Sequence, residues 1–242
     1  MHEHPAHSGI TPISLSRASS VLADRLRDLI LTGEFESGAM LPSERDIVAD
    51  SGLSRGSVRE ALRILETEGL VEMRTGRAGG ALVTTPTRAS LARSLEVFLR
   101  ANEVKLKVLL DCRLAIEPMM ARLAAESHSA DDLAMILQAH EDFLANSGDP
   151  EQYRPANFRW HLAVAHASQN EPLIALMESV REPILRSEGY NRLSTPSRRS
   201  GTIVAHTAVV DAIVARDGDR AARAMEAHLA TFRDIIAGTV RS

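Results

Sequence analysis

The sequence predicts a mainly α-helical protein with two domains. Aromatic residues make up only 3% of the 242 residues, a composition that favours closely packed helices over aromatic-rich strands. A chain of this length with 44% hydrophobic residues can bury one large core or two modest ones. The polar run 84-TTPTRAS-90 interrupts the helical periodicity. We therefore expect a disordered tail over 1–13, a first domain over 14–86 and an all-helical second domain over 87–242.

Net charge and cysteine content exclude some classes of protein. The formal net charge of −4 gives no whole-chain signature of nucleic-acid binding, so any basic patch has to be local. The single cysteine, Cys112, excludes an internal disulfide framework, and we expect it to be a small buried residue. The chain starts without the pattern of a signal peptide and holds no membrane-length apolar run. These features predict a cytoplasmic protein without a membrane partner.

Three helices are expected in the first domain. Residues 19–32 place their aliphatic side chains on one helical stripe. Ser43 can cap a short helix over 43–52, and a longer helix follows over 54–70 after a tight turn. Two short helices joined in this way, the second with hydroxyls and arginines at its N-terminal end, are typical of a helix-turn-helix with its recognition helix.

The start of the helix 54–70 carries the residue types that DNA requires. The N-terminal turns of a recognition helix enter the major groove, where Arg55 and Arg59, one turn apart on one face, can reach guanine edges or phosphates. Ser54, Ser57 and the free N–H groups of this helix end can meet phosphate oxygens. Each arginine alone would more often be a solvated surface residue. The prediction of DNA binding therefore rests on the arginines and serines together with the helix-turn-helix spacing.

A hairpin is expected directly after the recognition helix. Residues 70–86 alternate in polarity and turn at TGRAGG, as two short strands around a flexible tip would. Such a hairpin beside a helix-turn-helix is a wing, and it can lay Arg77 along the DNA backbone or into the minor groove. One helix-turn-helix makes too few contacts for a selective site, so we expect a homodimer on a palindromic operator of double-stranded DNA.

The run LPSERDIVADSGLSRGSVREALRILETEGLV resembles the winged-helix domain of the GntR family of bacterial transcription regulators. The family signature is Leu-Pro-Ser-Glu-Arg, followed by a helix that begins Ser-Arg-x-(Ser/Thr)-Val-Arg-Glu-Ala-Leu, and the resemblance covers residues 14–86. Gly56 stands where a polar residue is more usual, so one contact is expected to be missing. The resemblance implies that DNA is contacted by Arg45, Arg55, Ser57 and Arg59, with Gly76 and Arg77 at the wing.

The second domain is expected to be one antiparallel helical bundle, because tandem self-similarity is not evident. A bundle of this size can enclose a pocket. Four polar side chains lie on apolar helices where a core would favour hydrocarbon: Arg113, His161, His206 and His228. The periodicity predicts helices over 89–102, 104–127, 130–146, 151–169, 171–188, 198–216 and 218–239.

Each of these polar side chains requires a partner. Arg113 can reach Glu117, one turn along the helix, or an internal anion, and the residues leave both open. His161 follows Asn157 by four residues, which places both on one helix face and permits convergence on a metal. His166 lies about 140° around the helix from His161 and cannot easily point into the same site. From the residues alone, the three candidate histidines are either hydrogen-bonded core residues or metal ligands.

The segments DCRLAIE at 111–117, NFRWHLAVAHASQN at 157–170 and DGDRAARAMEAHL near the end are similar to the FCD effector domain of the FadR subfamily, over residues 90–238. The resemblance implies that an aspartate and three histidines surround a divalent metal, zinc first and nickel or manganese as alternatives. It also implies a small organic acid, a carboxylate effector, bound by the metal and an arginine. Carried over, the metal site is Asn157, His161, His206 and His228, and the effector-binding residues are Arg113 and Thr202.

Asn157 departs from the pattern, which usually has aspartate at this position. The site would carry one negative charge fewer and would hold a metal more weakly, through the amide oxygen or a water. The expected function is a DNA-binding transcriptional regulator, in the first instance a repressor of a metabolic operon, and not an enzyme. The alternatives are a metal-dependent hydrolase fused to a DNA-binding module and a regulator that senses the metal itself. Against the hydrolase, no acidic residue lies one turn from His161, His206 or His228.

Overall fold

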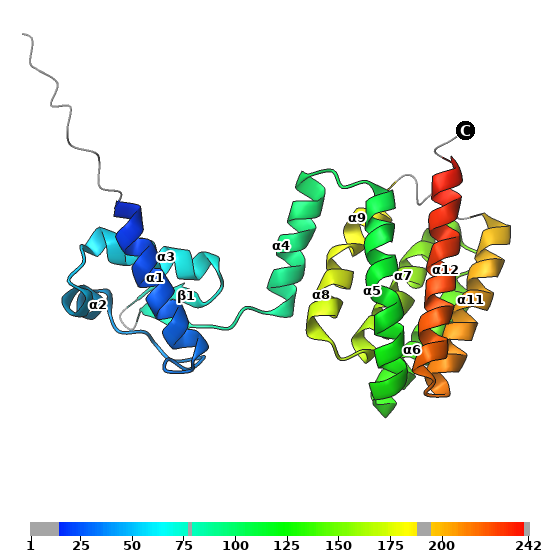
Figure 1. Cartoon of the computed structure of the whole chain (residues 1–242), viewed down its shortest axis with the longest axis horizontal. Helices are drawn as coiled ribbons and strands as arrows, with labels where there is room; N and C mark the ends of the chain where they lie inside the picture. The colour runs from blue at the N-terminus through cyan, green and yellow to red at the C-terminus, as the bar shows by residue number, and fades with distance from the viewer. Residues whose placement is uncertain (1–14, 77–78, 188–194, 240–242) are drawn as a thin grey trace, which may run out of the picture. The chain divides into compact units, whose positions relative to one another are not determined.

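The structure is a computed structural model of the chain, and it describes residues 15–76, 79–187 and 195–239. The expected tail over 1–13 and the wing residue Arg77 lie outside the described residues. The chain divides into two compact units, residues 1–87 and 88–242, and each is described by itself (Figure 1). Both units are mainly helical, which confirms the predicted fold class. Within the described ranges, no helix has the length and apolar character needed to cross a membrane.

The first unit is a winged helix-turn-helix. Helices α1 (Leu15–Leu31), α2 (Glu44–Ser51) and α3 (Arg55–Thr67) are followed by strands β1 (Val71–Arg74) and β2 (Gly80–Val83), which pair antiparallel. Met40 forms an isolated bridge to Leu82 and so ties the loop before α2 to the wing. The three helices and the hairpin share one apolar core, which includes Leu26, Ile47, Val58, Leu62, Leu65, Val71 and Val83.

The turn between α2 and α3 is fixed by caps that the sequence encodes. Gly52 adopts φ 68°, a left-handed conformation that L side chains rarely take, and its N–H donates to the carbonyl of Val48 to close α2. Ser54 then caps α3, because its side chain accepts from the N–H of Ser57. The two caps set the position at which the recognition helix α3 begins.

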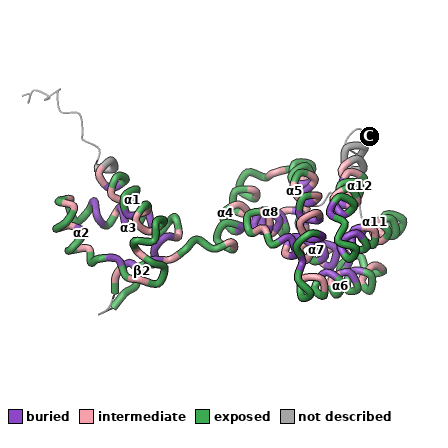
Figure 2. Tube along the Cα trace, turned by 60° about the horizontal axis from the view of Figure 1, so that its bottom comes forward, coloured by how far each residue is buried: buried purple, intermediate pink, exposed green. Residues whose placement is uncertain are grey.

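The second unit is a bundle of helices. Its described helices are α4 (Arg88–Ala101), α5 (Leu106–Ser127), α6 (Ala130–Ala145), α7 (Pro150–Ala167), α8 (Glu171–Ser179), α9 (Arg181–Leu185), α11 (Pro196–Val214) and α12 (Gly218–Thr239). Helix α5 packs most extensively on α12, which also packs on α11, and α7 packs on α5 and α6. Figure 2 shows buried positions on the facing sides of these helices. The main core includes Ala121, Ala124, Ile136, Trp160, Val164, Val209, Ile213 and Met225.

Two expectations about this unit were wrong. The single helix predicted over 171–188 is two helices, which meet at Val180. The physical reason is Pro183, whose nitrogen has no hydrogen to donate to the carbonyl four residues earlier. Cys112 is exposed rather than buried, because α5 turns Leu110 and Glu117 inward and position 112 lies on the opposite side of the helix.

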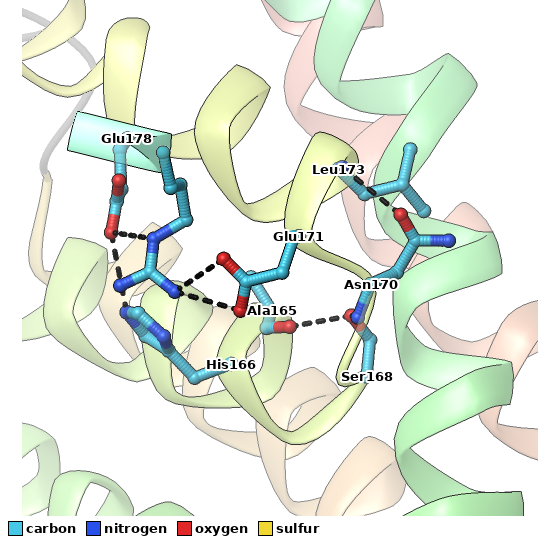
Figure 3. Close-up of polar contacts among 8 residues, drawn as sticks. Ala165, His166, Ser168, Asn170, Glu171, Leu173 and Glu178 are labelled. Atoms are coloured by element: carbon cyan, nitrogen blue, oxygen red, sulfur yellow. Dashed lines mark hydrogen bonds and ion pairs between the residues drawn. The ribbon is translucent and has the colours of Figure 1, made fainter. Parts of the chain in front are cut away.

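The start of α4 is fixed to α8 by an ion-pair cluster (Figure 3). Nη1 of Arg88 donates to both carboxylate oxygens of Glu171, at 3.0 and 3.1 Å. Nε of Arg88 lies 3.3 Å from Oε1 of Glu178. Nε2 of His166 lies 3.6 Å from the same oxygen, and the His166 side chain is 35% exposed. The first residue of the second unit is therefore anchored to the bundle, with His166 among the surface groups around it.

Candidate functional site

Three histidines from three helices meet inside the bundle. His161 lies on α7, His206 on α11 and His228 on α12, and one ring nitrogen of each lies within 4.8 Å of the others. The side chains of His161 and His206 are buried, and His228 is half-buried. Helix periodicity turns each of them into the same interior, although 67 residues separate the first from the last in sequence.

The separation and the type of these donors fit a zinc-sized ion. Nε2 of His206 lies 3.3 Å from Nε2 of His228. Two nitrogens bound at 2.0–2.1 Å to a tetrahedral zinc would lie about 3.3 Å apart. The His206 ring is held by stacking on Trp160, with ring centroids 3.6 Å apart and planes at 16°. Neutral imidazoles suit zinc and nickel better than magnesium or calcium, which favour oxygen ligands.

The surroundings of the three rings favour their neutral forms, which are the forms that bind metal. Burial lowers the pKa of His206 well below its usual value, and the neighbouring imidazoles lower it further. Loss of solvent contact in the cavity wall, with smaller effects of His161 and Arg113, lowers the pKa of His228 to about 3. Burial also lowers the pKa of His161, although Glu117 opposes the change. A lone pair is therefore available on each ring at neutral pH.

These pKa values predict that the metal-free protein loses stability in mild acid. As the pH falls below 6.5, the unfolded chain takes up protons on His206 and His228 that the folded chain excludes, down to about pH 3 for His228, so the free energy of unfolding decreases. The slope is about 1.4 kcal/mol per pH unit for each histidine that stays neutral when folded. Urea titrations at pH 7 and pH 5 measure it. A His206→Ala variant should show a shallower slope, and equal stability of the wild type at both pH values would contradict the prediction.

A buried carboxylate joins this cluster from α5. Oε2 of Glu117 lies 2.6 Å from Nδ1 of His161, and Oε1 accepts a hydrogen bond from Nε of Arg113. The side chains of Glu117 and Arg113 are each only 2% exposed. Burial alone would raise the pKa of Glu117, but the charge of Arg113 and the contact with His161 lower it below its usual value. The ion pair that the residues permitted between Arg113 and Glu117 is present, and it extends to a histidine on another helix.

A cavity of about 410 Å³ adjoins the cluster. It is enclosed by α5, α7, α11 and α12, and its apolar wall is formed by residues such as Ala205, Ala208 and Phe232. Nη2 of Arg113 is buried and has no hydrogen-bond partner among the described residues. Of the predicted metal and effector residues, the cavity is lined by Arg113, Asn157, His161, Thr202 and His228, whereas His206 lies behind this wall against Trp160.

Thr202 and Asn157 have different surroundings in the cavity wall. The hydroxyl of Thr202 donates to the carbonyl of Arg198, one turn earlier on α11, at 3.0 Å. The oxygen therefore keeps a lone pair for a donor in the cavity. Asn157 is 5% exposed and lies one turn before His161 on α7. Its amide contributes polarity to the wall but no negative charge.

The predicted DNA-contacting residues lie at the start of α3 and near it. Arg45, at the start of α2, has an 86% exposed side chain. Arg59 is 71% exposed, and its Nε lies 2.8 Å from Oε2 of Glu44, so α2 orients this guanidinium. Ser57 is buried and its hydroxyl lies 2.9 Å from that of Ser54, so both hydroxyls serve the helix cap. The remaining predicted residues are Arg55, which is exposed, and Gly76, which has φ 110° at the wing.

A winged helix-turn-helix followed by a helical domain with a polar internal pocket defines a DNA-binding regulator with a ligand domain. Residues 18–80 match the family described as bacterial regulatory proteins, gntR family, and residues 108–231 match the FCD domain. The chain belongs to the GntR family of transcription regulators and carries an FCD domain, which confirms the resemblance drawn from its motifs. Membership of this family identifies a transcription regulator and not an enzyme.

Similar proteins cover most of the chain. A protein of Escherichia coli (strain K12) that is named as a regulatory protein of the L-lactate dehydrogenase operon is 34% identical over 220 residues, 88% of this chain and 84% of that protein. The HTH-type transcriptional regulator LutR of Bacillus subtilis (strain 168) is 32% identical over 214 residues, 87% and 97% of the two chains. A solved structure of a GntR protein of Streptococcus agalactiae matches with a TM-score of 0.58 at 25% identity, covering 89% of this chain and 99% of that one.

Proposed function

We propose that this regulator represses a metabolic operon as a homodimer and changes its affinity for the operator when a small organic acid binds beside a divalent metal. In this proposal it is of the FadR type. The N-terminal domain expected over residues 14–86 binds the DNA, and residues 87–242 bind metal and acid and form the dimer. An effector can act only by binding the DNA-competent and DNA-incompetent arrangements with different affinity. The linker around Pro86 is where that difference reaches the first unit.

The observation that carries the proposal is a cluster of three neutral histidines beside a cavity that His161, His228 and an unpaired guanidinium nitrogen of Arg113 border. His161, His206 and His228 would hold the metal, with Asn157 as a further oxygen donor. Zinc, the ion that these donors suit best, would supply a positive charge in a buried site. Nη2 of Arg113 would donate to the carboxylate of the acid, and the hydroxyl oxygen of Thr202, on α11, would accept from a hydroxyl group of the acid. A buried donor left without a partner is costly, so an anionic ligand would satisfy Arg113.

The size and the wall of the cavity indicate which acids to test. One relative is named for the L-lactate dehydrogenase operon, so L-lactate is the first ligand to examine. A volume of about 410 Å³ also admits larger hydroxy acids and dicarboxylates. Arg198 and Arg199 lie in the same wall, and Cζ of Arg199 is 5.8 Å from the centre of the Tyr153 ring. A second acidic group on the ligand would therefore meet positive charge.

An exposed apolar stripe on α4 supports the homodimer. Leu91 and Phe98, seven residues apart and so on one helix face, are 54% and 57% exposed, and Val97 beside them is 59% exposed. Pairing such stripes from two chains would remove apolar surface from water. A dimer would also present two recognition helices to a palindromic operator, which doubles the contacts that α3 makes alone.

Arg55→Ala and Arg59→Ala should each weaken operator binding, because both arginines lie at the N-terminal end of α3. If they contact bases, the expected loss is about 1–3 kcal/mol for each. Fluorescence anisotropy on DNA selected by the protein from a random library measures the loss. Arg63→Ala is the matched control, since Arg63 is exposed one turn further along α3 and pairs with Glu60. Unchanged affinity of both variants would contradict the assignment of α3 as the recognition helix.

A thermal-shift screen tests the ligand proposal. Organic acids, with L-lactate first, should raise the melting temperature of the full chain when zinc is present and much less when it is absent. A ligand that binds only the folded state stabilises that state, so its binding raises the melting temperature. If zinc itself raises the melting temperature but no acid adds to it, the metal is the signal. If neither zinc nor any acid changes it, the pocket has another role.

A further inference from the structure

We propose that Glu117 is a positioning residue that holds His161 ready for the metal and Arg113 ready for the acid. The inference rests on the proposed function of the pocket and adds a residue that is absent from the cavity wall in the described part of the chain. Glu117 acts through two others, because one carboxylate oxygen contacts each of them. Position 117 therefore links the metal-binding and acid-binding sides of the pocket.

The contact with His161 selects one form of the imidazole. Nδ1 of His161 lies 2.6 Å from Oε2 of Glu117, and we assign the ring hydrogen to Nδ1, on the side of this carboxylate. The other ring nitrogen, Nε2, then carries the lone pair. Nε2 is buried without a hydrogen-bond partner among the described residues. A carboxylate behind a histidine ligand fixes its ring orientation and tautomer and makes it a stronger donor to metal.

The contact between Glu117 and Arg113 occupies one nitrogen of the guanidinium and leaves another for a ligand. Nε of Arg113 donates to Oε1 of Glu117, whereas Nη2 remains without a partner in the described structure. The ion pair fixes the plane of the guanidinium and leaves one donor for a ligand. It also offsets the positive charge of Arg113, which would otherwise repel a metal ion in the same buried space.

The charge of Glu117 matters here because the histidine cluster itself contains no carboxylate among the described residues. Asn157, His161, His206 and His228 are all uncharged in their neutral forms. Glu117 therefore supplies the negative charge that contacts the cluster, and it would act on the metal through His161. The sequence places it one turn from Arg113, but its contact with His161 depends on how α5 packs against α7.

Glu117→Gln in the full-length protein tests the proposal, with zinc alone as the probe. The substitution keeps the size of the side chain and removes its charge. Isothermal titration in the presence of a competing chelator should show zinc affinity lower by about 10-fold to 100-fold. Glu126→Gln is the matched control, because Glu126 lies on the same helix with a 49% exposed side chain. It should bind zinc as the wild type does.

A second measurement separates positioning from a general loss of structure. In zinc-free protein labelled with ¹⁵N-histidine, His161 of the wild type should show the single tautomer with hydrogen on Nδ1, and Glu117→Gln should show a mixture. If Glu117→Gln does not fold, Glu117→Asp keeps the charge near Arg113 but withdraws it from His161, and it should also lower zinc affinity. Equal zinc affinity in the folded variant and the wild type, or an unchanged tautomer, overturns the role of Glu117. Failure of the wild type to bind zinc overturns the proposed metal site itself.

Discussion

A His206→Ala variant is expected to lose zinc affinity by on the order of 100-fold or more, while the zinc-free protein keeps its affinity for operator DNA. The substitution removes one of three nitrogen donors and the partner that lies 3.3 Å from Nε2 of His228. Two histidines cannot enclose a zinc ion without further ligands. The acid response should be lost with the metal, because the acid would bind the metal directly.

Metal content after dialysis, measured by inductively coupled plasma mass spectrometry, checks this prediction. His166→Ala is the control, because His166 belongs to the same bundle but contacts Glu178 at the surface. It should retain the metal of the wild type. Because His206 stacks on Trp160 in the core, the zinc-free melting temperatures of both variants must also be compared. Equal metal content in His206→Ala and the wild type would contradict the three-histidine site.

An Asn157→Asp variant should bind zinc more tightly, by on the order of 10-fold, because a carboxylate offsets the charge of the ion and an amide does not. The same charge should weaken acid binding, since the zinc site would then attract a carboxylate less strongly. Without zinc the new carboxylate is buried and costly, so the zinc-free variant should melt earlier than the wild type and recover when zinc is added. Higher zinc affinity together with lower acid affinity is therefore the result expected for Asn157→Asp.

Isothermal titration with zinc, and then with L-lactate or whichever acid the thermal screen selects, measures both changes. Asn146→Asp adds the same charge at the C-terminal cap of α6 and should alter neither affinity. Zinc affinity that is unchanged in Asn157→Asp would show that position 157 does not face the metal.

The fold was predictable because it depends on patterns that are local in sequence. Apolar spacing identified the helices, and capping signals such as Ser43 and Gly52 marked their ends. The break at Val180 was missed because the long apolar pattern over 171–188 outweighed the signal of Pro183. Cys112 was placed inside on residue type alone, although its position relative to the buried Leu110 and Glu117 puts it on the outer face of α5.

The candidate site was predictable only in part. Its histidines stand out because each is a polar residue on an apolar helix, and the family resemblance adds their roles. The contacts of Glu117 with His161 and of Glu44 with Arg59 join different helices, so they depend on packing and leave no periodic signal in one segment. An acidic residue on an inward face of a core helix, such as Glu117, is nevertheless a signal that a partner lies on a neighbouring helix.

The most direct test is the affinity of the full-length protein for its selected operator DNA. Fluorescence anisotropy measures this affinity with and without zinc, and in each case with and without L-lactate and the other acids of the screen. We expect an acid to change the affinity at least about 10-fold when zinc is bound, and we expect the change to disappear when zinc is removed or His206 is replaced by alanine. An operator affinity that no acid alters in the zinc-loaded protein would contradict this expectation.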